Sequence, residues 1–206
     1  MENQYYPFYN TPLPYEYDAL EPYIDEKTMY LHHDRHLQTY IDNLNQVMKE
    51  NPWLQNLSLE EMLYHLENIP DKQSVGIRKN AGGVYNHRFF FDTMSPEGNA
   101  QPVGKIKQGI EQTFGSYETF KKMFKDAALK VFGSGYAWLV TNGNGFYIIT
   151  TQNQDTPLEF GWTPVVGIDV WEHSYYLKHY NERNKYIDDW FQVVDWKKAE
   201  EKCCNK

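Results

Sequence analysis

The hydrophobic period changes from helical to strand-like near residue 136, and this change limits the possible folds more than any other feature. From residue 136 onward, two runs rich in β-branched and aromatic residues, YAWLVT and FYIITT, flank the sequence NGNG. Asn-Gly pairs between two such runs are typical of an antiparallel hairpin. A β-branched run, TPVVGID, ends on Asp169 and predicts a third strand. The second half of the chain is therefore expected to contain a small antiparallel sheet.

Before the hairpin, apolar residues recur at helical spacing. Residues 28–49 form the first such run, which ends at Asn-Pro-Trp. A shorter helix is predicted to begin at Ser58, where Glu61 completes a capping box. A third run covers residues 72–94, and a linker rich in proline, glycine and serine follows at 95–105. The first half of the chain is therefore predicted to be helical.

After the linker, the pattern predicts a region of mixed structure. A helix capped by Ser116 is expected to stop at Gly133, before the three strands, and helical spacing returns from Glu172 to the C-terminus. The predicted fold class is α+β. A helical hairpin domain is expected at 1–96, and a domain with an antiparallel three-stranded sheet and flanking helices at 97–206.

Composition and charge exclude several classes of function. The net charge of −8 and the pI near 5.4 argue against a nucleic-acid partner, which would require a basic stripe, and against an anionic membrane surface. No apolar run approaches the length of a membrane span, and the first residues do not resemble an export signal. We expect a cytoplasmic protein, with an exported or surface-associated protein whose signal has been removed as the alternative. Cys203 and Cys204 are expected to be reduced thiols without a structural role.

Histidines occur on the predicted helices at spacings that place them on shared faces. His32, His36 and Tyr40 are four residues apart and form one stripe. His87 follows the pair Gly82–Gly83, and each glycine inside a helix costs about 1 kcal/mol relative to alanine. We therefore expect another group to approach the helix closely at these glycines. Because Gly83 has no side chain, it also leaves room beside His87, which lies one turn later.

Asp169 and His173 are four residues apart where the third strand gives way to helical sequence. A strand end can direct the acid into a cleft, and the next turn can place the imidazole beside it. Three imidazoles and one carboxylate suit a first-row metal ion, and without a thiolate iron or manganese is at least as suitable as zinc. The alternative is that Asp169 caps the following helix and His173 is paired on its surface.

The chain resembles the iron and manganese superoxide dismutases over nearly its whole length, from Leu13 to about residue 196. DVWEHSYY at 169–176 is similar to the family pattern D-x-W-E-H-A-Y-Y. Further segments match in the family's order and at its spacings: LPYEYDALEPYID, MYLHHDRHLQTY, KNAGGVYNHRFFF, FGSGYAWLV and TTQNQDTP.

This resemblance implies that two superoxide anions are converted into dioxygen and hydrogen peroxide by a single metal ion that alternates between its divalent and trivalent states. Zinc is disfavoured because the reaction needs a redox-active ion. The implied ligands, with a solvent molecule as the fifth, are His32, His87, Asp169 and His173. Tyr40 matches the family's gateway tyrosine in the network that delivers protons, and Gln154 and His36 complete the implied catalytic set.

The resemblance also bears on which metal is used. Manganese-type members supply an outer-sphere glutamine from the sheet half and carry glycine four residues before the second ligand. Gln154 in NQD and Gly83 before His87 both follow this pattern. Manganese is therefore the expected cofactor, with iron as the alternative.

A homodimer, or a dimer of dimers, is the assembly that the resemblance implies. Glu172 would orient His173 of the partner subunit, and Tyr176 would meet His36 of the partner subunit. Trp171 belongs to the implied outer sphere of the metal. Arg183 and Arg35 match basic positions at the border of the substrate funnel, although a solvated surface charge is an equal alternative for Arg35.

Two residues depart from the family's usual pattern. Tyr136 and Phe91 each stand where the family often has tryptophan. Together with Trp138 and Gly83 they are expected to line the active-site pocket. The hydroxyl of Tyr136 would need a hydrogen-bond partner there.

Two other roles compete with catalysis. One is a catalytically idle relative that stores manganese or acts as a scaffold, although the implied outer sphere of Tyr40, Gln154 and Trp171 argues against it. The other is a surface component that is cross-linked oxidatively through its tyrosines, a role for which the leader MENQYYPFYN would be suited.

Overall fold

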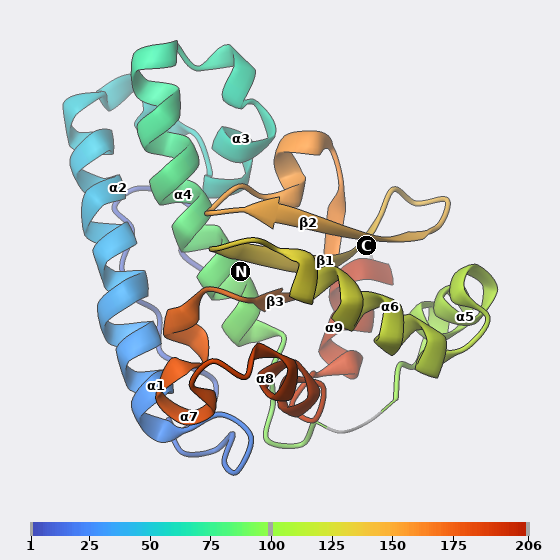
Figure 1. Ribbon diagram of the computed structural model, residues 1–206. Helices are drawn as coiled ribbons and strands as arrows, with labels where there is room; N and C mark the ends of the chain where they lie inside the picture. The colour runs from blue at the N-terminus through green and yellow to red at the C-terminus, as the bar shows by residue number, and fades with distance from the viewer. Residues whose placement is uncertain (1, 99–100, 205–206) are drawn as a thin grey trace.

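The computed structural model describes residues 2–98 and 101–204, and its helical part lies beside a three-stranded sheet (Figure 1). Helix α1, Glu26–Leu31, continues into a π-helical segment, His32–Leu37, and then into α2, Gln38–Glu50. Helix α4, Asp71–Asp92, runs back beside α2. The two helices pack through fully buried apolar residues such as Leu44 and Ile77. The predicted helical hairpin is therefore confirmed.

The π-helical segment is a feature that the sequence did not predict. It interrupts the first long helix at the point where the histidine stripe begins. A π-helical turn has hydrogen bonds from residue i to i+5, so it is wider than an α-helical turn, and such turns are frequent at functional sites. His32 and His36 remain neighbours on it, with ring centroids 6.2 Å apart.

The short helix α3, Leu59–Tyr64, packs on α4 and begins as predicted. The hydroxyl of Ser58 accepts a hydrogen bond from the Glu61 amide at 3.2 Å, and the Glu61 carboxylate accepts one from the Ser58 amide at 2.8 Å. The capping box is therefore confirmed. Two short 3₁₀ segments, Pro52–Asn56 and Leu66–Asn68, flank this helix.

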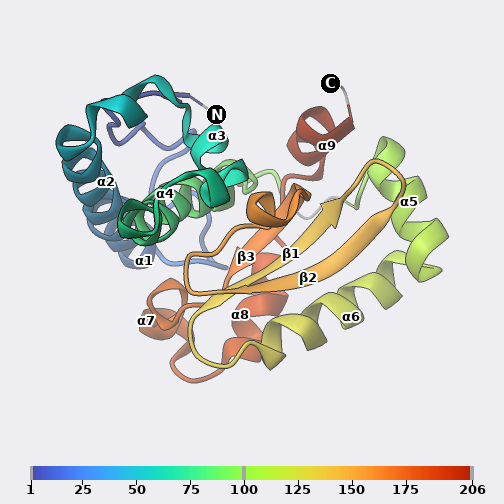
Figure 2. The ribbon, with the colours of Figure 1, turned by 90° about the horizontal axis from the view of Figure 1, so that it is seen from above.

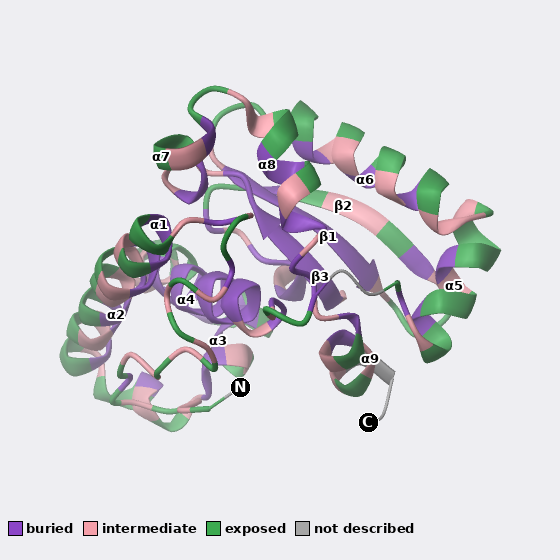
Figure 3. Cartoon of the chain, turned by 90° about the horizontal axis from the view of Figure 1, so that it is seen from below, coloured by how far each residue is buried: buried purple, intermediate pink, exposed green. Residues whose placement is uncertain are grey.

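The sheet contains β1, Gly135–Thr141, β2, Phe146–Gln152, and β3, Thr163–Asp169, in the order β2-β1-β3. Both pairings are antiparallel, and β1 and β2 are joined at NGNG, as predicted. The central strand β1 is almost entirely buried. Its register places Tyr136 opposite Asp169, at the end of β3. Part of the core lies between this sheet and the buried stretch of α4 (Figure 3).

Helices cover both faces of the sheet (Figure 2). Helices α5, Gly104–Phe114, and α6, Tyr117–Lys130, pack on one face, and α4 and α9, Trp196–Cys204, pack on the other. The sequence predicted α6 with its cap: the Ser116 hydroxyl accepts a hydrogen bond from the Thr119 amide at 3.1 Å. Helix α5 was not predicted, because Ile106 and Ile110 alone form its buried face.

The C-terminal sequence forms several short helices. After a 3₁₀ segment, Glu172–Ser174, the chain forms α7, Tyr176–His179, α8, Arg183–Trp190, and then α9. Helix α7 ends at Tyr180, whose φ of 51° cannot continue a right-handed helix. The expectation of helical structure after Glu172 is confirmed, although in the described part of the chain it is divided into four segments.

Among the described residues, no helix is both long and apolar enough to cross a membrane. The side chains of Cys203 and Cys204 lie outside the part that the structure describes, so the expectation for these thiols stays a prediction. The division into domains at residues 96 and 97 also stays a prediction.

Candidate metal centre

The structure brings together four side chains from distant parts of the chain. They are the first residue of the π-helical segment, a residue in the middle of α4, the last residue of β3 and a residue of the following 3₁₀ segment: His32, His87, Asp169 and His173. One ligand atom from each lies within 4.8 Å of the others, and all but His173 are buried. These are the four residues that the sequence resemblance implied as ligands.

The distances between these atoms match those around a common ion. The Asp169 Oδ2 lies 3.3 Å from the Nε2 atoms of both His32 and His173, and 4.0 Å from that of His87. The two Nε2 atoms of His32 and His173 are 3.2 Å apart. Bonds of about 2.1 Å to one ion place neighbouring ligand atoms roughly 3 to 4 Å apart. The four side chains therefore fit a single metal ion.

His87 presents a buried nitrogen that a metal ion would satisfy. Its Nδ1 lies 2.6 Å from the Gly83 carbonyl oxygen, which can only accept, so Nδ1 carries the proton. The lone pair of Nε2 then faces the cluster. This nitrogen is buried and has no hydrogen-bond partner among the described residues. A buried acceptor without a partner costs free energy, and a metal ion would satisfy it.

Backbone contacts fix the carboxylate. Its Oδ1 accepts a hydrogen bond from the Trp171 amide at 2.8 Å, which leaves Oδ2 facing the imidazoles. The Tyr186 hydroxyl donates to the Asp169 carbonyl oxygen at 2.9 Å and anchors the strand end. Sequence reasoning missed Tyr186, because no spacing links a residue of α8 to the end of β3.

The electrostatics favour neutral imidazoles at His32 and His87 and an ionised Asp169. Burial, followed by the neighbouring His173, lowers the pKa of His32 to about 4. Burial also holds the pKa of His87 well below 6.5. Burial raises the pKa of Asp169, but the charge of His173 and hydrogen bonds from His173 and His32 outweigh it, so the pKa lies well below 3.8. At His32, His87 and Asp169 a metal would thus meet ligand groups that are already deprotonated.

A hydrogen-bonded group of three side chains, Tyr40, Gln154 and Asn86, lies beside the cluster. The Gln154 amide donates to the Tyr40 hydroxyl at 3.2 Å, and the Asn86 amide donates to the Gln154 side-chain oxygen at 3.2 Å. The Tyr40 ring lies 5.3 Å from the His87 ring. Burial raises the pKa of Tyr40, so its phenol keeps its proton at neutral pH. The structure therefore places Tyr40 and Gln154 in contact beside the metal centre.

The two helical glycines make room for this group. A Cβ atom at position 83 would overlap with the Tyr40 ring, and one at position 82 would overlap with the Gln154 carbonyl oxygen. The expected close approach at Gly82–Gly83 is therefore confirmed. It comes from Tyr40 on one helix and Gln154 from the loop after β2.

Besides the His87 ring, two rings outside the ligand set lie nearly parallel to the His173 imidazole. His36 stacks on it with centroids 4.1 Å apart and planes at 23°, and Trp171 lies 5.4 Å away at 26°. The Trp171 indole donates to the Asn153 carbonyl oxygen at 3.0 Å. These contacts restrict the orientation of His173, the most exposed of the four side chains.

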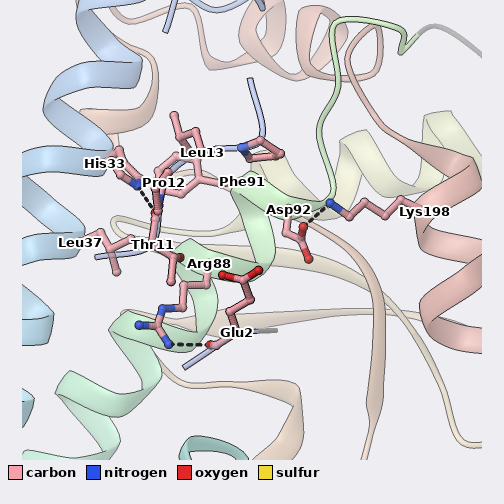
Figure 4. Close-up of a pocket in the computed structure, with 11 residues that line it drawn as sticks. Glu2, Thr11, Pro12, Leu13, His33, Leu37, Arg88, Phe91, Asp92 and Lys198 are labelled. Carbon is pink, nitrogen blue, oxygen red and sulfur yellow. Dashed lines mark hydrogen bonds and ion pairs between the residues drawn. The ribbon is translucent and has the colours of Figure 1, made fainter. Parts of the chain in front are cut away.

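Three of the expected pocket residues, Phe91, Tyr136 and Trp138, are buried. The Phe91 ring is 5.0 Å from the His32 ring and also lines a cavity of about 650 Å³ beneath the N-terminal segment (Figure 4). The cavity is bordered by Arg88, which donates to the Tyr9 carbonyl oxygen, and by the ion pair between Asp92 and Lys198. Phe91 therefore separates this cavity from the metal centre.

Tyr136 and Trp138 are fully buried on β1 and stack on each other. The Trp138 indole donates to the Thr151 hydroxyl at 2.9 Å. Tyr136 is the nearer of the two to the metal centre, because it lies opposite Asp169 in the sheet register.

The residues expected at an interface lie near the surface. Glu172 is exposed and its carboxylate forms no hydrogen bond or ion pair within the described part of the chain, and Tyr176 is half exposed. The Arg183 guanidinium donates to the carbonyl oxygens of Val131 and Gly133 at 2.6 and 2.9 Å. It thereby holds the loop that presents Phe132, whose exposed fraction is 94%.

Arg35 is exposed. Its guanidinium donates to the Tyr30 hydroxyl at 3.1 Å and lies over the Tyr30 ring. This position is compatible with both alternatives for Arg35, a role in guiding an anion and a solvated surface charge.

The helical hairpin supplies two histidines, and the sheet with the segment after it supplies one aspartate and one histidine. This arrangement is that of a mononuclear metalloprotein. Comparison with known families identifies it further. Residues 7–95 match the α-hairpin domain of the iron/manganese superoxide dismutases, and residues 102–202 match their C-terminal domain. The chain belongs to the iron/manganese superoxide dismutase family.

Similar proteins include several superoxide dismutases named for manganese. The chain is 51% identical to superoxide dismutase [Mn] 3 of Leptolyngbya boryana over 90% of this chain and 78% of that protein. It is 46% identical to the superoxide dismutase [Mn] of Listeria innocua, over 91% and 93% of the two chains. For that of Thermus thermophilus the identity is 43% over 95% and 97%.

Proposed function

We propose that this protein is a superoxide dismutase that converts two superoxide anions into dioxygen and hydrogen peroxide with one manganese ion. The observation that carries this proposal is the convergence of three imidazole nitrogens and one carboxylate oxygen within 4.8 Å, in a member of the iron/manganese superoxide dismutase family. Its similarity to enzymes named for manganese supports the choice of metal.

The proposed ligands are His32, His87, Asp169 and His173. Manganese bound there would supply one-electron exchange between its divalent and trivalent states. One carboxylate and three neutral imidazoles contribute a single negative charge, which leaves a divalent or trivalent ion with a net positive charge. This local charge favours an anionic substrate although the chain as a whole carries −8.

The residues beside the ligands would manage protons, because peroxide formation consumes two of them. Tyr40 keeps its phenolic proton at neutral pH and contacts Gln154, so the pair can pass a proton inward from solvent. Asn86 holds the Gln154 amide in one orientation. His36 and Trp171 keep the His173 ring in place.

Manganese is proposed over iron because of two positions. Gln154 comes from the loop after β2 and contacts Tyr40 beside the metal centre. Gly83 has no side chain, and the Tyr40 ring fills the space that a side chain would take. A second amide at position 83 would compete for the same space. Iron is the alternative cofactor.

We further propose that the enzyme assembles as a two-fold homodimer or a dimer of dimers. The unpaired carboxylate of Glu172 and the exposed rings of Tyr176 and Phe132 support a partner surface there. Glu172 would bind His173 of the partner subunit, and Tyr176 would meet His36 of the partner subunit. The two domains at 1–96 and 97–206 would contribute two ligands each. The cytoplasmic location stays a prediction from the sequence.

The test is superoxide consumption by the purified protein after its metal has been removed and replaced with manganese or with iron. We expect activity that follows manganese content. Activity with iron alone would overturn the choice of metal. A protein that binds manganese and consumes no superoxide would instead be the scaffold or store considered above.

A further inference from the structure

One face of α4 supports the segment that carries Gln154. This segment, residues 154–159, follows β2, and three residues of α4 at intervals of four lie against it: Arg78, Gly82 and Asn86. Residues four apart in a helix lie on the same face. A Cβ atom at Gly82 would overlap with the Gln154 carbonyl oxygen, and the Asn86 side-chain amide donates to that oxygen at 3.2 Å. Gly82 and Asn86 thus contact Gln154 itself, whereas Arg78 contacts residues further along the segment.

Arg78 lies close to two carboxylates of the segment. Its guanidinium is 3.1 Å from the Glu159 Oε2 and 3.8 Å from the Asp155 Oδ1. The exposed fraction of the Glu159 side chain is 4%, whereas Arg78 and Asp155 are partly exposed. The Glu159 Oε2 forms no hydrogen bond with the described residues, so Arg78 compensates this oxygen through its charge. Water can solvate Asp155, but the buried carboxylate of Glu159 depends on the cation beside it.

The other oxygen of Glu159 binds the backbone of the same segment. Its Oε1 accepts a hydrogen bond from the Thr156 amide at 2.9 Å. Thr156 is two residues after Gln154, whose side chain donates to the Tyr40 hydroxyl at 3.2 Å. If the Glu159 side chain turned outward to regain water, it would release the Thr156 amide. The ion pair therefore fixes the backbone beside the side chain that contacts Tyr40.

We propose that Arg78 and Glu159 are positioning residues for proton delivery: their ion pair holds the backbone at Thr156 against α4 and so keeps Gln154 in contact with the Tyr40 hydroxyl. This proposal rests on the proposed function, in which Tyr40 and Gln154 pass the proton. Removing one partner of a buried ion pair leaves an uncompensated charge, which is costly, whereas replacing both partners by neutral groups can cost little. A single and a double substitution should therefore differ.

Arg78→Met removes the cation and leaves the Glu159 carboxylate buried without it. Pulse radiolysis of the manganese-loaded variant gives kcat at high superoxide concentration and kcat/KM at low concentration. We expect kcat to fall roughly tenfold, because the proton-delivering pair is displaced. The value of kcat/KM should stay within about twofold, because the ligands keep their positions and the charge of a half-exposed arginine is screened. Arg78→Lys keeps the charge and should keep kcat within about twofold of the wild type.

The double substitution Arg78→Met with Glu159→Gln tests the role of the buried charge. The amide oxygen introduced at position 159 is neutral and can still accept from the Thr156 amide, so kcat should recover to within about threefold of the wild type. Lys125→Met is the matched control. It breaks an ion pair of 2.5 Å with Asp188, which joins α6 to α8, and it should leave kcat unchanged. If Arg78→Met does not fold, Glu159→Ala, which releases the Thr156 amide without leaving a buried charge, should show the same fall in kcat.

A wild-type kcat in folded Arg78→Met would overturn the proposal. Equal proportional losses of kcat and kcat/KM would overturn it as well, because they would reflect a smaller folded and metal-loaded fraction and a purely structural ion pair. A double variant no faster than Arg78→Met would contradict the role of the buried charge. Failure of the wild type to bind manganese or to consume superoxide is a different result, because it contradicts the proposed function itself.

Discussion

Gly83 on α4 and the Tyr40 ring on α2 pack directly against each other. The backbone of α4 at Gly83 lies so close to the Tyr40 ring on α2 that a Cβ atom there would overlap with three ring carbons. The same glycine accepts the Nδ1–H of His87 through its carbonyl oxygen. A single residue without a side chain thus sets both the position of the tyrosine and the tautomer of the histidine.

Gly83→Ala should displace the Tyr40 ring and break its hydrogen bond to Gln154. We expect at least a tenfold loss of superoxide consumption and a stability loss of roughly 1–3 kcal/mol, as for an overpacked core. Gly76→Ala is the control in the same helix. Its Cβ would meet Val47 at an ordinary 3.5 Å, so it should stabilise the helix by up to about 1 kcal/mol. Urea unfolding and activity measurements distinguish the two variants. Equal stability and equal activity of Gly83→Ala and Gly76→Ala would contradict the steric argument.

Tyr40→Phe removes the hydroxyl that contacts Gln154 and keeps the ring. Superoxide consumption should fall by roughly ten- to a hundredfold, because proton delivery slows, while the manganese content stays the same. Tyr64→Phe, a half-exposed tyrosine on α3, should have no effect. Pulse radiolysis at high superoxide concentration measures the loss. Full activity of Tyr40→Phe would exclude this phenol from the proton path.

Glu172→Ala should damage both assembly and metal retention, because the carboxylate is proposed to orient His173 of the partner subunit. We expect dissociation of dimers at micromolar protein concentration in analytical ultracentrifugation and faster loss of manganese on dialysis. The control is Glu67→Ala, which removes a carboxylate whose exposed fraction is 69%. If the Glu172 variant keeps both its dimer and its metal, the proposed contact across the interface is wrong.

The metal-free protein should lose stability as the pH falls below about 6.5. Burial lowers the pKa of His32 to about 4 and that of His87 below its usual value, so the unfolded chain binds these protons first. Above the unfolded pKa near 6.5, the stabilisation that comes from keeping these two imidazoles neutral is complete. As the pH falls toward 4, the free energy of unfolding drops by up to roughly 1.4 kcal/mol per pH unit for each histidine. Urea unfolding between pH 7.5 and 5 measures this slope, and His65→Gln, at an exposed histidine, should leave it unchanged. Stability that is constant over this range would contradict the assignment of neutral, buried imidazoles.

The sequence predicted the elements whose signals are local. Ser58 with Glu61, the NGNG turn and the β-branched run before Asp169 each depend on neighbouring residues, and each has the predicted structure. Helix α5 was missed because its apolar face has only two buried residues. The π-helical segment was missed because hydrogen-bond register within a helix leaves no mark on residue spacing.

For the candidate site, the resemblance to a family supplied more than spacing could. Spacing alone paired Asp169 with His173 and left His32 and His36 as equal members of one stripe. The structure separates them: His32 lies against the carboxylate, whereas His36 stacks on the outer side of His173. The contacts of Tyr186 with Asp169 and of Asn86 with Gln154 depend on tertiary packing, and no pattern in the chain indicates them.

We propose that one manganese ion lies among His32, His87, Asp169 and His173. The most direct measurement is X-ray diffraction at the manganese absorption edge from crystals of the manganese-loaded protein. We expect one anomalous peak per chain, about 2 Å from the Nε2 atoms of the three histidines and from the Asp169 Oδ2. A peak at another place, or no peak in a protein that consumes superoxide, would contradict this proposal.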